Sequence, residues 1–193
     1  MRALEKVKSQ LKPGQVYRRA DLEKLSRSVD RDIASLVHEG ALVKVGSGLY
    51  QCPQQSRFGL LPASTDNLIS SFLKDDEYLL TSPNDYNALG LGTTQLYNYQ
   101  IVYNHKRHGR FELGGQLFEF QRKPRFPKKA TPEFLLVDLL NNLGHLAEDR
   151  DAVLARARAR AQEMDANRLR AAVKSFAKVS TRKLLDEALA NGS

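Results

Sequence analysis

An α+β fold is predicted for this 193-residue chain by the order of its hydrophobic patterns. Helical periodicity dominates residues 1–40 and the stretch from residue 131 onward, whereas β-prone runs separated by glycine-containing turns occur between them. Hydrophobic residues make up 41% of the chain and charged residues 27%, which provides enough apolar side chain for a packed core. The length suits one average domain or two small ones.

Three helices are expected before residue 41. Residues 3–11 have apolar positions on one face, and Lys12-Pro13-Gly14 ends that helix because proline lacks the backbone donor. A second helix is expected from Arg19 to Leu25. Ser26-Arg27-Ser28 then provides a turn and an N-cap for a third helix, which Gly40 ends by taking the left-handed cap conformation. The buried face of the third helix is expected to carry Val29, Ile33, Leu36 and Val37.

A β-hairpin is expected directly after the third helix. Residues 41–45 and 49–53 are β-prone, and Gly46-Ser47-Gly48 between them suits a tight turn. Helix, helix, short turn, helix and hairpin, in this order, form the winged helix-turn-helix arrangement. The order carries the prediction, because each element alone is common. Residues 1–60 are therefore expected to form an N-terminal winged helix-turn-helix DNA-binding domain.

A small mixed α+β module is expected over residues 61–123. It begins with a helix over residues 64–74, capped by Ser64 or Thr65, and continues with a short strand at residues 78–80. Ser82-Pro83 then caps a further helix that Gly90 ends. Three strands complete the module, at residues 100–103, 110–113 and 116–121.

A linker and a helical bundle follow the module. Residues 124–130 contain two prolines and are expected to be extended. Thr131-Pro132-Glu133 begins a helix, since proline suits the first helical position. Further helices are expected over residues 150–164, 167–178 and 181–190. Module, linker and the helical tail of residues 131–193 together are expected to form a C-terminal domain, residues 61–193.

The basic surplus of the chain lies mainly in its first third. The formal net charge is +8, and residues 1–60, with eleven basic and six acidic residues, account for +5 of it. Residues 61–130 contribute +2 and residues 131–193 contribute +1. A concentrated basic surplus favours a polyanionic partner. A nucleic-acid surface is therefore expected in residues 1–60.

Composition also excludes two classes of protein. No stretch approaches the roughly 18 apolar residues that a membrane span requires, and the charged start MRALEKVK has no apolar signal region. The single cysteine, Cys52, excludes an internal disulfide and any zinc site that needs two thiolates. We therefore expect a cytoplasmic protein in a reducing compartment, without a membrane partner.

The polar residues around the third helix are the candidate DNA contacts. Those at or before its start lie where helix-turn-helix proteins reach base edges, and an arginine there can bind guanine with two hydrogen bonds. Basic residues of the preceding helix and of the hairpin suit backbone phosphates. The predicted contacts are Arg18, Arg19, Lys24, Arg27, Ser28, Asp30, Arg31 and Lys44. The alternative is that these are solvated charges on a winged helix that binds protein.

The remaining reactive side chains form no recognisable site in the sequence. His105 and His108 have the H-x-x-H spacing of a metal pair, but they lie in a basic turn without a nearby carboxylate or cysteine, so a solvated loop is the better interpretation. Cys52 has no base partner beside it. Since no acid–base or nucleophile constellation emerges, we expect no catalysis, no metal and no cofactor.

The segment from Arg27 to Pro53, RSVDRDIASLVHEGALVKVGSGLYQCP, resembles the winged-helix start of the AbiEi family. These proteins are the antitoxins of type IV toxin–antitoxin (abortive infection) systems. The later segment SPNDYNALGLGTTQLYNYQIVY is similar to the family's central part, a helix closed by a Gly-Leu pair before a strand. The resemblance covers about residues 17–122.

The resemblance implies a transcriptional autorepressor that binds repeats in its own promoter through the N-terminal domain. It also implies that the C-terminal part antagonises a nucleotidyltransferase toxin, usually without a stable complex. Carried over by position, Arg27, Ser28, Arg31 and Lys44 fall in the turn, the recognition helix and the wing. Two other functions stay open: a stand-alone repressor that senses a ligand in the central module, and an adaptor that docks proteins on its winged helix. The sequence leaves the oligomeric state open as well.

Overall fold

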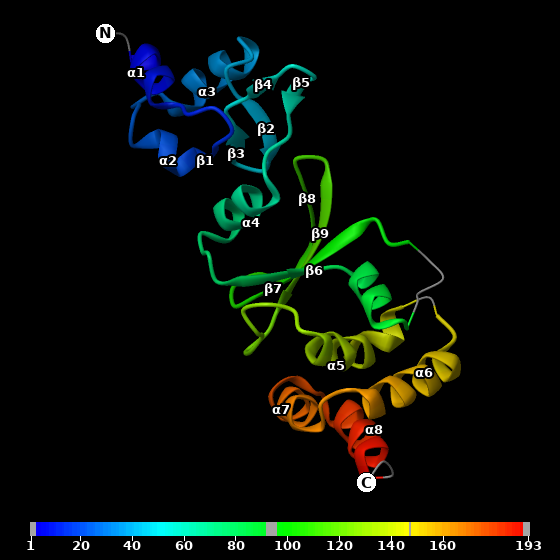
Figure 1. Ribbon diagram of the computed structural model, residues 1–193. Coiled ribbons are helices and arrows are strands. Elements are labelled where there is room, and N and C mark those ends of the chain that lie inside the picture. The colour runs from blue at the N-terminus through cyan, green and yellow to red at the C-terminus, as the bar shows by residue number, and fades with distance from the viewer. Residues whose placement is uncertain (1–2, 92–95, 147, 191–193) are drawn as a thin grey trace. The chain divides into compact units, whose positions relative to one another are not determined.

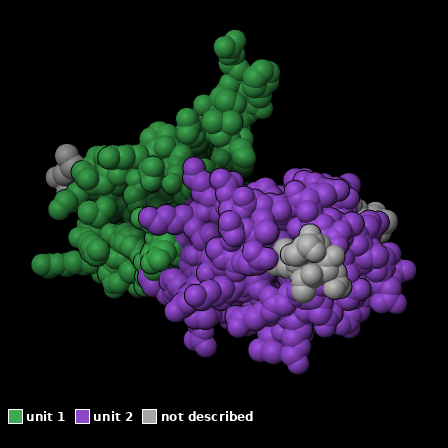
Figure 2. Space-filling model, turned by 60° about the horizontal axis from the view of Figure 1, so that its bottom comes forward, with its two compact units in different colours: residues 1–77, 110–118 green, residues 78–109, 119–193 purple. Residues whose placement is uncertain are grey.

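The computed structural model describes residues 3–91, 96–146 and 148–190, and the chain forms two compact units (Figures 1 and 2). Unit 1 comprises residues 1–77 and 110–118, and unit 2 comprises residues 78–109 and 119–193. The α+β class is confirmed, with helices and small sheets first, a four-stranded sheet in the middle of the chain and helices last. The prediction that residues 1–60 and residues 61–193 are separate domains stays a prediction.

Unit 1 begins with a winged helix. Along the chain its elements are α1 (Ala3–Gln10), β1 (Val16–Arg18), α2 (Arg19–Glu23), α3 (Val29–His38), β2 (Val43–Gly46) and β3 (Leu49–Gln51). The strands pair antiparallel in the order β1-β3-β2, so that the β2–β3 hairpin forms the wing. The expected helices and hairpin are thus present in the expected order. Strand β1 was not expected, because three residues are too short to show an alternating pattern.

The core beneath α3 differs from the expectation at one position. Val29, Ile33 and Leu36 are buried as predicted, together with Leu22 of α2. The prediction that Val37 is buried is wrong, because its side chain is 38% exposed. Successive helical residues lie about 100° apart, so a face centred on Leu36 turns its neighbour toward solvent. Asp32 is also buried, on the other side of Leu36 from Val37.

Two further elements complete this part of unit 1. A second hairpin, β4 (Gln54–Ser56) and β5 (Gly59–Leu61), was not expected. Helix α4 (Thr65–Leu73) begins at Ser64, whose side chain accepts a hydrogen bond from the backbone N–H of Asn67 over 3.2 Å. Its Ser71 hydroxyl donates to the carbonyl of Val16 over 3.4 Å, which ties α4 to strand β1.

Unit 2 combines strands with all the C-terminal helices. After β6 (Tyr78–Thr81) comes the 3-10 helix η1 (Pro83–Leu89), and then β7 (Tyr99–Asn104), β8 (Gly109–Leu113) and β9 (Gln116–Arg122). The sheet order is β6-β7-β9-β8, and residues 110–118 of the last hairpin belong to unit 1. The helices are α5 (Pro132–Asn142), the short η2 (Leu143–His145), α6 (Arg150–Glu163), α7 (Ala166–Phe176) and α8 (Val179–Ala190), close to the expected bounds.

Helix α5 is the centre of unit 2. Seven consecutive residues, Phe134 to Leu140, are buried, so α5 is covered on every side. Its apolar side chains share one core with Ile101 and Tyr103 of β7 and with Leu169 of α7. Figure 1 shows α5 between the strands of this unit and helices α6 to α8. The C-terminal helices and the strands of unit 2 therefore depend on one core.

A buried carboxylate lies within this core. The hydroxyl of Tyr86 donates to Asp138 Oδ2 over 2.8 Å, and the hydroxyl of Tyr103 donates to Asp138 Oδ1 over 2.6 Å. The amide of Asn142 donates to Asp138 Oδ1 over 3.1 Å. Burial raises the pKa of Asp138, against the opposing effect of these donors. The cluster joins α5 to η1 and β7 through hydrogen bonds to a buried carboxyl group.

Removal of one donor tests the role of this cluster. We expect Tyr103→Phe to lower the free energy of unfolding by about 1–3 kcal/mol, because the Asp138 carboxylate and the Asn142 amide each lose a buried partner. Urea denaturation followed by circular dichroism measures the change. The matched control is Tyr50→Phe, since Tyr50 makes no side-chain hydrogen bond with a described residue. Equal effects of the two substitutions would contradict this role.

Candidate nucleic-acid interface

The turn between α2 and α3 is built around a buried hydrogen bond. The Ser26 hydroxyl donates to Asp32 Oδ2 over 2.5 Å and accepts the backbone N–H of Ser28 over 3.0 Å. Ser28 is the N-cap residue of α3, but its side chain makes no capping hydrogen bond. The Ser28 hydroxyl is therefore left exposed at the start of α3.

Arg18 is engaged where β1 passes into α2. Its Nε lies 2.7 Å from Asp21 Oδ2 and its Nη2 lies 2.8 Å from Asp21 Oδ1, while its backbone N–H also donates to Asp21. The Arg18 guanidinium lowers the pKa of the Asp21 carboxyl. Lys24 is exposed and its Nζ lies 4.0 Å from Asp21 Oδ1. This arrangement caps α2, so Arg18 has a structural role in the first turn.

Arg19 joins α2 to α3. Its Nε and Nη2 lie 2.7 Å from Asp30 Oδ1 and Oδ2, and its Nη1 lies 3.2 Å from Glu23 Oε2. The planar guanidinium fork matches a carboxylate in this two-bond geometry. Hydrogen bonding to Arg19 lowers the pKa of Asp30. Asp30 thus lies at the start of α3 as predicted, with its charge already paired.

Three of the predicted cations carry unpaired charge. Arg27 in the turn, Arg31 in the first turn of α3 and Lys44 on β2 are exposed, and none forms an ion pair with a described residue. The structure thus divides the eight predicted residues. Arg18, Arg19 and Asp30 are held in intramolecular ion pairs, and Lys24 is exposed with its Nζ 4.0 Å from Asp21. Arg27, Ser28, Arg31 and Lys44 present polar groups to solvent.

A shallow groove of about 500 Å³ runs along the exposed face of α3. Asp30 and Lys44 lie on its lining, and the sequence analysis missed the other residues there. These are Ile33, Ala34, Val37, His38 and Tyr50. The positions 30, 34, 37 and 38 follow helical spacing on the side away from the core, which is the signal that would have found them. Small apolar side chains on such a face can contact thymine methyl groups.

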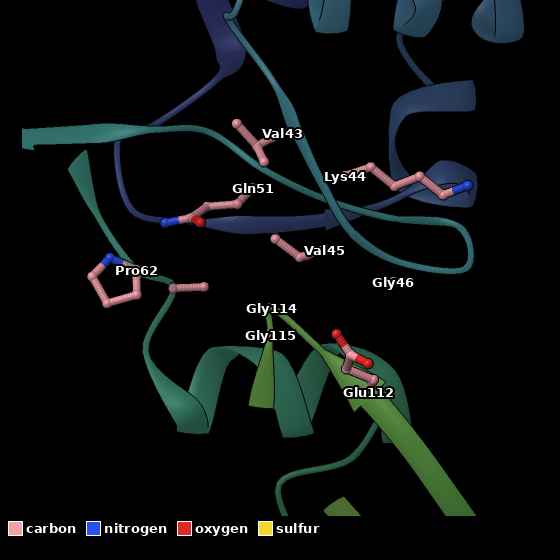
Figure 3. A pocket seen from close by; sticks show the side chains of 10 residues that line it. Val43, Lys44, Val45, Gly46, Gln51, Pro62, Glu112, Gly114 and Gly115 are labelled. Atoms are coloured by element: carbon pink, nitrogen blue, oxygen red, sulfur yellow. The ribbon is translucent and has the colours of Figure 1, made fainter. Parts of the chain in front are cut away.

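The β8–β9 turn contacts strand β2 of the wing. The backbone N–H of Gly114 donates to the carbonyl of Val45 over 2.7 Å. A Cβ on Gly46 would lie 2.9 Å from a terminal methyl of Leu113, so a residue with a side chain here would require Leu113 to shift. Figure 3 shows Gly114 and Gly115 facing Val45, within a pocket of about 420 Å³ that Gln51, Pro62 and Glu112 also line. These contacts fix the strand that carries Lys44.

A search of solved structures finds a similar fold in the crystal structure of RV2827C protein from Mycobacterium tuberculosis. The TM-score is 0.59 and the sequence identity is 15%, over 100% of this chain and 76% of that chain. The two proteins share a fold. No protein-family model matches this sequence, and neither does any curated protein.

The similarity to RV2827C extends beyond the winged helix. Because it covers the whole of this chain, it includes α5 to α8, which lie outside the segment of residues 17–122 that resembles the AbiEi family. At this identity the comparison describes architecture alone.

The other candidate groups show local structural roles. His105 Nδ1 lies 2.9 Å from the carbonyl oxygen of Lys123, and the His105 ring stacks on Phe126 with ring centroids 4.7 Å apart. Burial raises the pKa of the Cys52 thiol. Within residues 3–91, 96–146 and 148–190, no three or more His, Cys, Asp or Glu side chains are grouped to bind a metal ion, and no helix is long and apolar enough to cross a membrane.

The Arg19–Asp30 pair predicts a measurable titration. In Arg19→Ala we expect the pKa of Asp30 to rise toward the ordinary value of about 3.9, because the hydrogen-bonding cation is gone. In the parent chain, this pair stabilises the fold at pH values above the pKa that Asp30 has in the unfolded chain. The stabilisation is lost as the pH falls through the lowered pKa that Asp30 has in the folded chain. Carboxyl-detected NMR titration measures the shift. Asp21 is the internal control, since Arg18 still holds it; an unchanged Asp30 pKa would contradict the pairing.

Proposed function

We propose that this protein is a DNA-binding transcriptional repressor of its own operon, with α3 in the major groove and the β2–β3 wing on the adjacent backbone. The observation that carries the proposal is the winged helix whose exposed side presents Arg27, Arg31 and Lys44 without ion pairs among the described residues. The charge distribution supports it, because residues 1–60 hold +5 of the net +8.

The residues have distinct roles in this proposal. Arg27, Ser28 and Arg31, at the N-terminal end of α3, contact base edges and the nearest phosphates, and Lys44 contacts the backbone from the wing. Lys24, exposed and only distantly paired with Asp21, adds a phosphate contact. Arg18, Arg19 and Asp30 act by positioning, since their ion pairs set the start of α2 and its angle to α3. No step in this function requires catalysis, a metal or a cofactor.

A mobility-shift assay with the duplex directly upstream of the gene tests the proposal. If four to six basic residues contact phosphates, log K should fall with log salt concentration at a slope of about −4 to −5. Arg27→Ala with Arg31→Ala should weaken binding and reduce that slope by about two, because two phosphate or base contacts are lost.

The matched control removes the same charge elsewhere. Arg168→Ala with Arg170→Ala, on the exposed side of α7, should leave affinity and slope within error of the parent chain. A flat salt response of the parent would rule out DNA binding through this surface. Unchanged affinity of the Arg27/Arg31 variant would favour the adaptor function instead.

We propose further that unit 2 antagonises a nucleotidyltransferase toxin. The segment that resembles the central part of the AbiEi family, residues 82–103, begins directly after β6 and includes η1 and most of β7, which share a core with α5 to α8. Deletion of residues 124–193 would remove α5 from that core, so only the full chain can test this function.

Coexpression with the protein encoded by the neighbouring gene provides that test. The Arg27→Ala, Arg31→Ala double variant should bind the operator more weakly and still protect cells from growth arrest, because its substitutions lie in unit 1. Protection is read as colony counts after induction of the neighbouring gene. Growth arrest despite normal levels of the parent chain would favour the stand-alone repressor.

A further inference from the structure

The tip of the β4–β5 hairpin presents an aromatic ring to solvent. Phe58 is 99% exposed, although burial of a phenylalanine side chain is strongly favourable. The turn beneath it is ordered: the backbone N–H of Phe58 donates to Ser56 Oγ over 3.1 Å, and the Ser56 hydroxyl donates to the carbonyl of Gly59 over 3.0 Å. Gly59 has φ +112°, which a residue with a side chain rarely adopts. Local hydrogen bonds therefore order the turn that carries the exposed ring.

The hairpin itself has little support within unit 1. Most residues of β4 and all of β5 are exposed. One contact that holds it to the winged helix is the side-chain amide of Gln51, at the end of β3, which donates to the carbonyl of Leu61 over 3.2 Å, and the side chain of Gln54 lies close to Gly14. An isolated two-stranded hairpin is marginally stable in water. An ordered, exposed hairpin with an aromatic tip is therefore suited to a partner that stabilises it.

Charge complementarity identifies a polyanion as that partner. The chain from Gly40 to Thr65 contains no aspartate or glutamate, and its two charged residues are Lys44 on the wing and Arg57 beside Phe58 at the tip. Gln54 and Gln55 on β4 add exposed amides that can donate and accept hydrogen bonds. Both hairpins that follow α3 are thus positive and free of carboxylates.

The size of the tip favours a groove of DNA over a protein surface. A stable protein interface buries about 800 Å² on each partner, supplied by about 20–30 residues a side. This hairpin offers far fewer residues: Arg57 and Phe58 at the tip, with Leu60 and Leu61 exposed along β5. The minor groove is only about 6 Å wide, and DNA-bending proteins insert phenylalanine between base steps there. We propose that the β4–β5 hairpin is a second DNA-contacting element, which inserts Phe58 into the minor groove while Arg57 binds a flanking phosphate. The inference rests on the proposed function, since it requires duplex DNA on unit 1.

Fluorescence of 2-aminopurine placed step by step along the upstream duplex tests the insertion. The parent chain should raise the fluorescence at one or two steps, because a wedge unstacks the base, and Phe58→Ala should abolish the rise. The same variant should bind about tenfold more weakly, as expected for loss of one base–aromatic contact, with an unchanged salt slope because no charge is removed. Phe58→Trp should retain the signal.

Two controls separate this proposal from its alternatives. Leu96→Ala removes an apolar side chain that is 89% exposed in unit 2, and it should change neither affinity nor fluorescence. Arg57→Ala should reduce the salt slope by about one and leave the fluorescence rise in place. Circular dichroism of each variant should match the parent, since the altered side chains are exposed.

The outcomes distinguish the two proposals. If the parent binds DNA but Phe58→Ala binds equally well and no step gains fluorescence, the hairpin proposal fails and the repressor function stands. If the parent binds no DNA, both fail. If Phe58→Ala instead converts a dimer to a monomer in sedimentation velocity without any change in DNA fluorescence, the tip is a contact between copies of the chain, and the hairpin proposal is wrong.

Discussion

The hydrogen bond between Ser26 and Asp32 is the constraint on which the proposed DNA surface depends. Both residues are buried, and the 2.5 Å contact closes the turn that separates α2 from α3. Because Asp32 points inward to satisfy this turn, Arg27 on the turn and Arg31 on the helix are left on the outside. The Arg19–Asp30 pair then fixes α2 against α3 from the solvent side. One buried contact thus closes the turn between α2 and α3, and one exposed ion pair adds to the apolar core that the two helices share.

The wing depends on a second, backbone-based constraint. Gly46 and Gly114 allow the β8–β9 turn to approach β2 closely enough for a hydrogen bond between main chains. A Cβ on Gly114 would also lie 3.1 Å from Leu68, and the φ of +57° at this position favours glycine. The lysine on the wing is therefore supported by residues more than sixty positions away in the chain. In unit 2 the buried Asp138 has a comparable role, because it joins α5 to η1 and β7.

The sequence predicted the elements that have a clear period or a strong end signal. Helices α3 to α8 and the wing were found because Gly40, Ser64, Thr131 and regularly spaced leucines mark them. Strands β1, β4 and β5 were missed, since three residues cannot show alternation and β5 is exposed along its whole length. Val37 was wrongly assigned to the buried face of α3, because it is apolar and adjacent in sequence to the buried Leu36. The Arg19–Asp30 pair could not be predicted, because Asp30 reaches Arg19 only through the fold. The Arg18–Asp21 and Arg19–Glu23 pairs have the i,i+3 and i,i+4 spacing of a helix, a signal that the sequence analysis did not use.

The central claim is that DNA binds to unit 1 along the exposed side of α3 and the wing. Amide chemical-shift mapping of the ¹⁵N-labelled chain with the upstream duplex tests this claim most directly. The account predicts that the largest changes fall at residues 27–31 and 43–46 and at the tip around Phe58, while α5 to α8 change little. Changes concentrated in unit 2, or no changes at all at low salt, would contradict it.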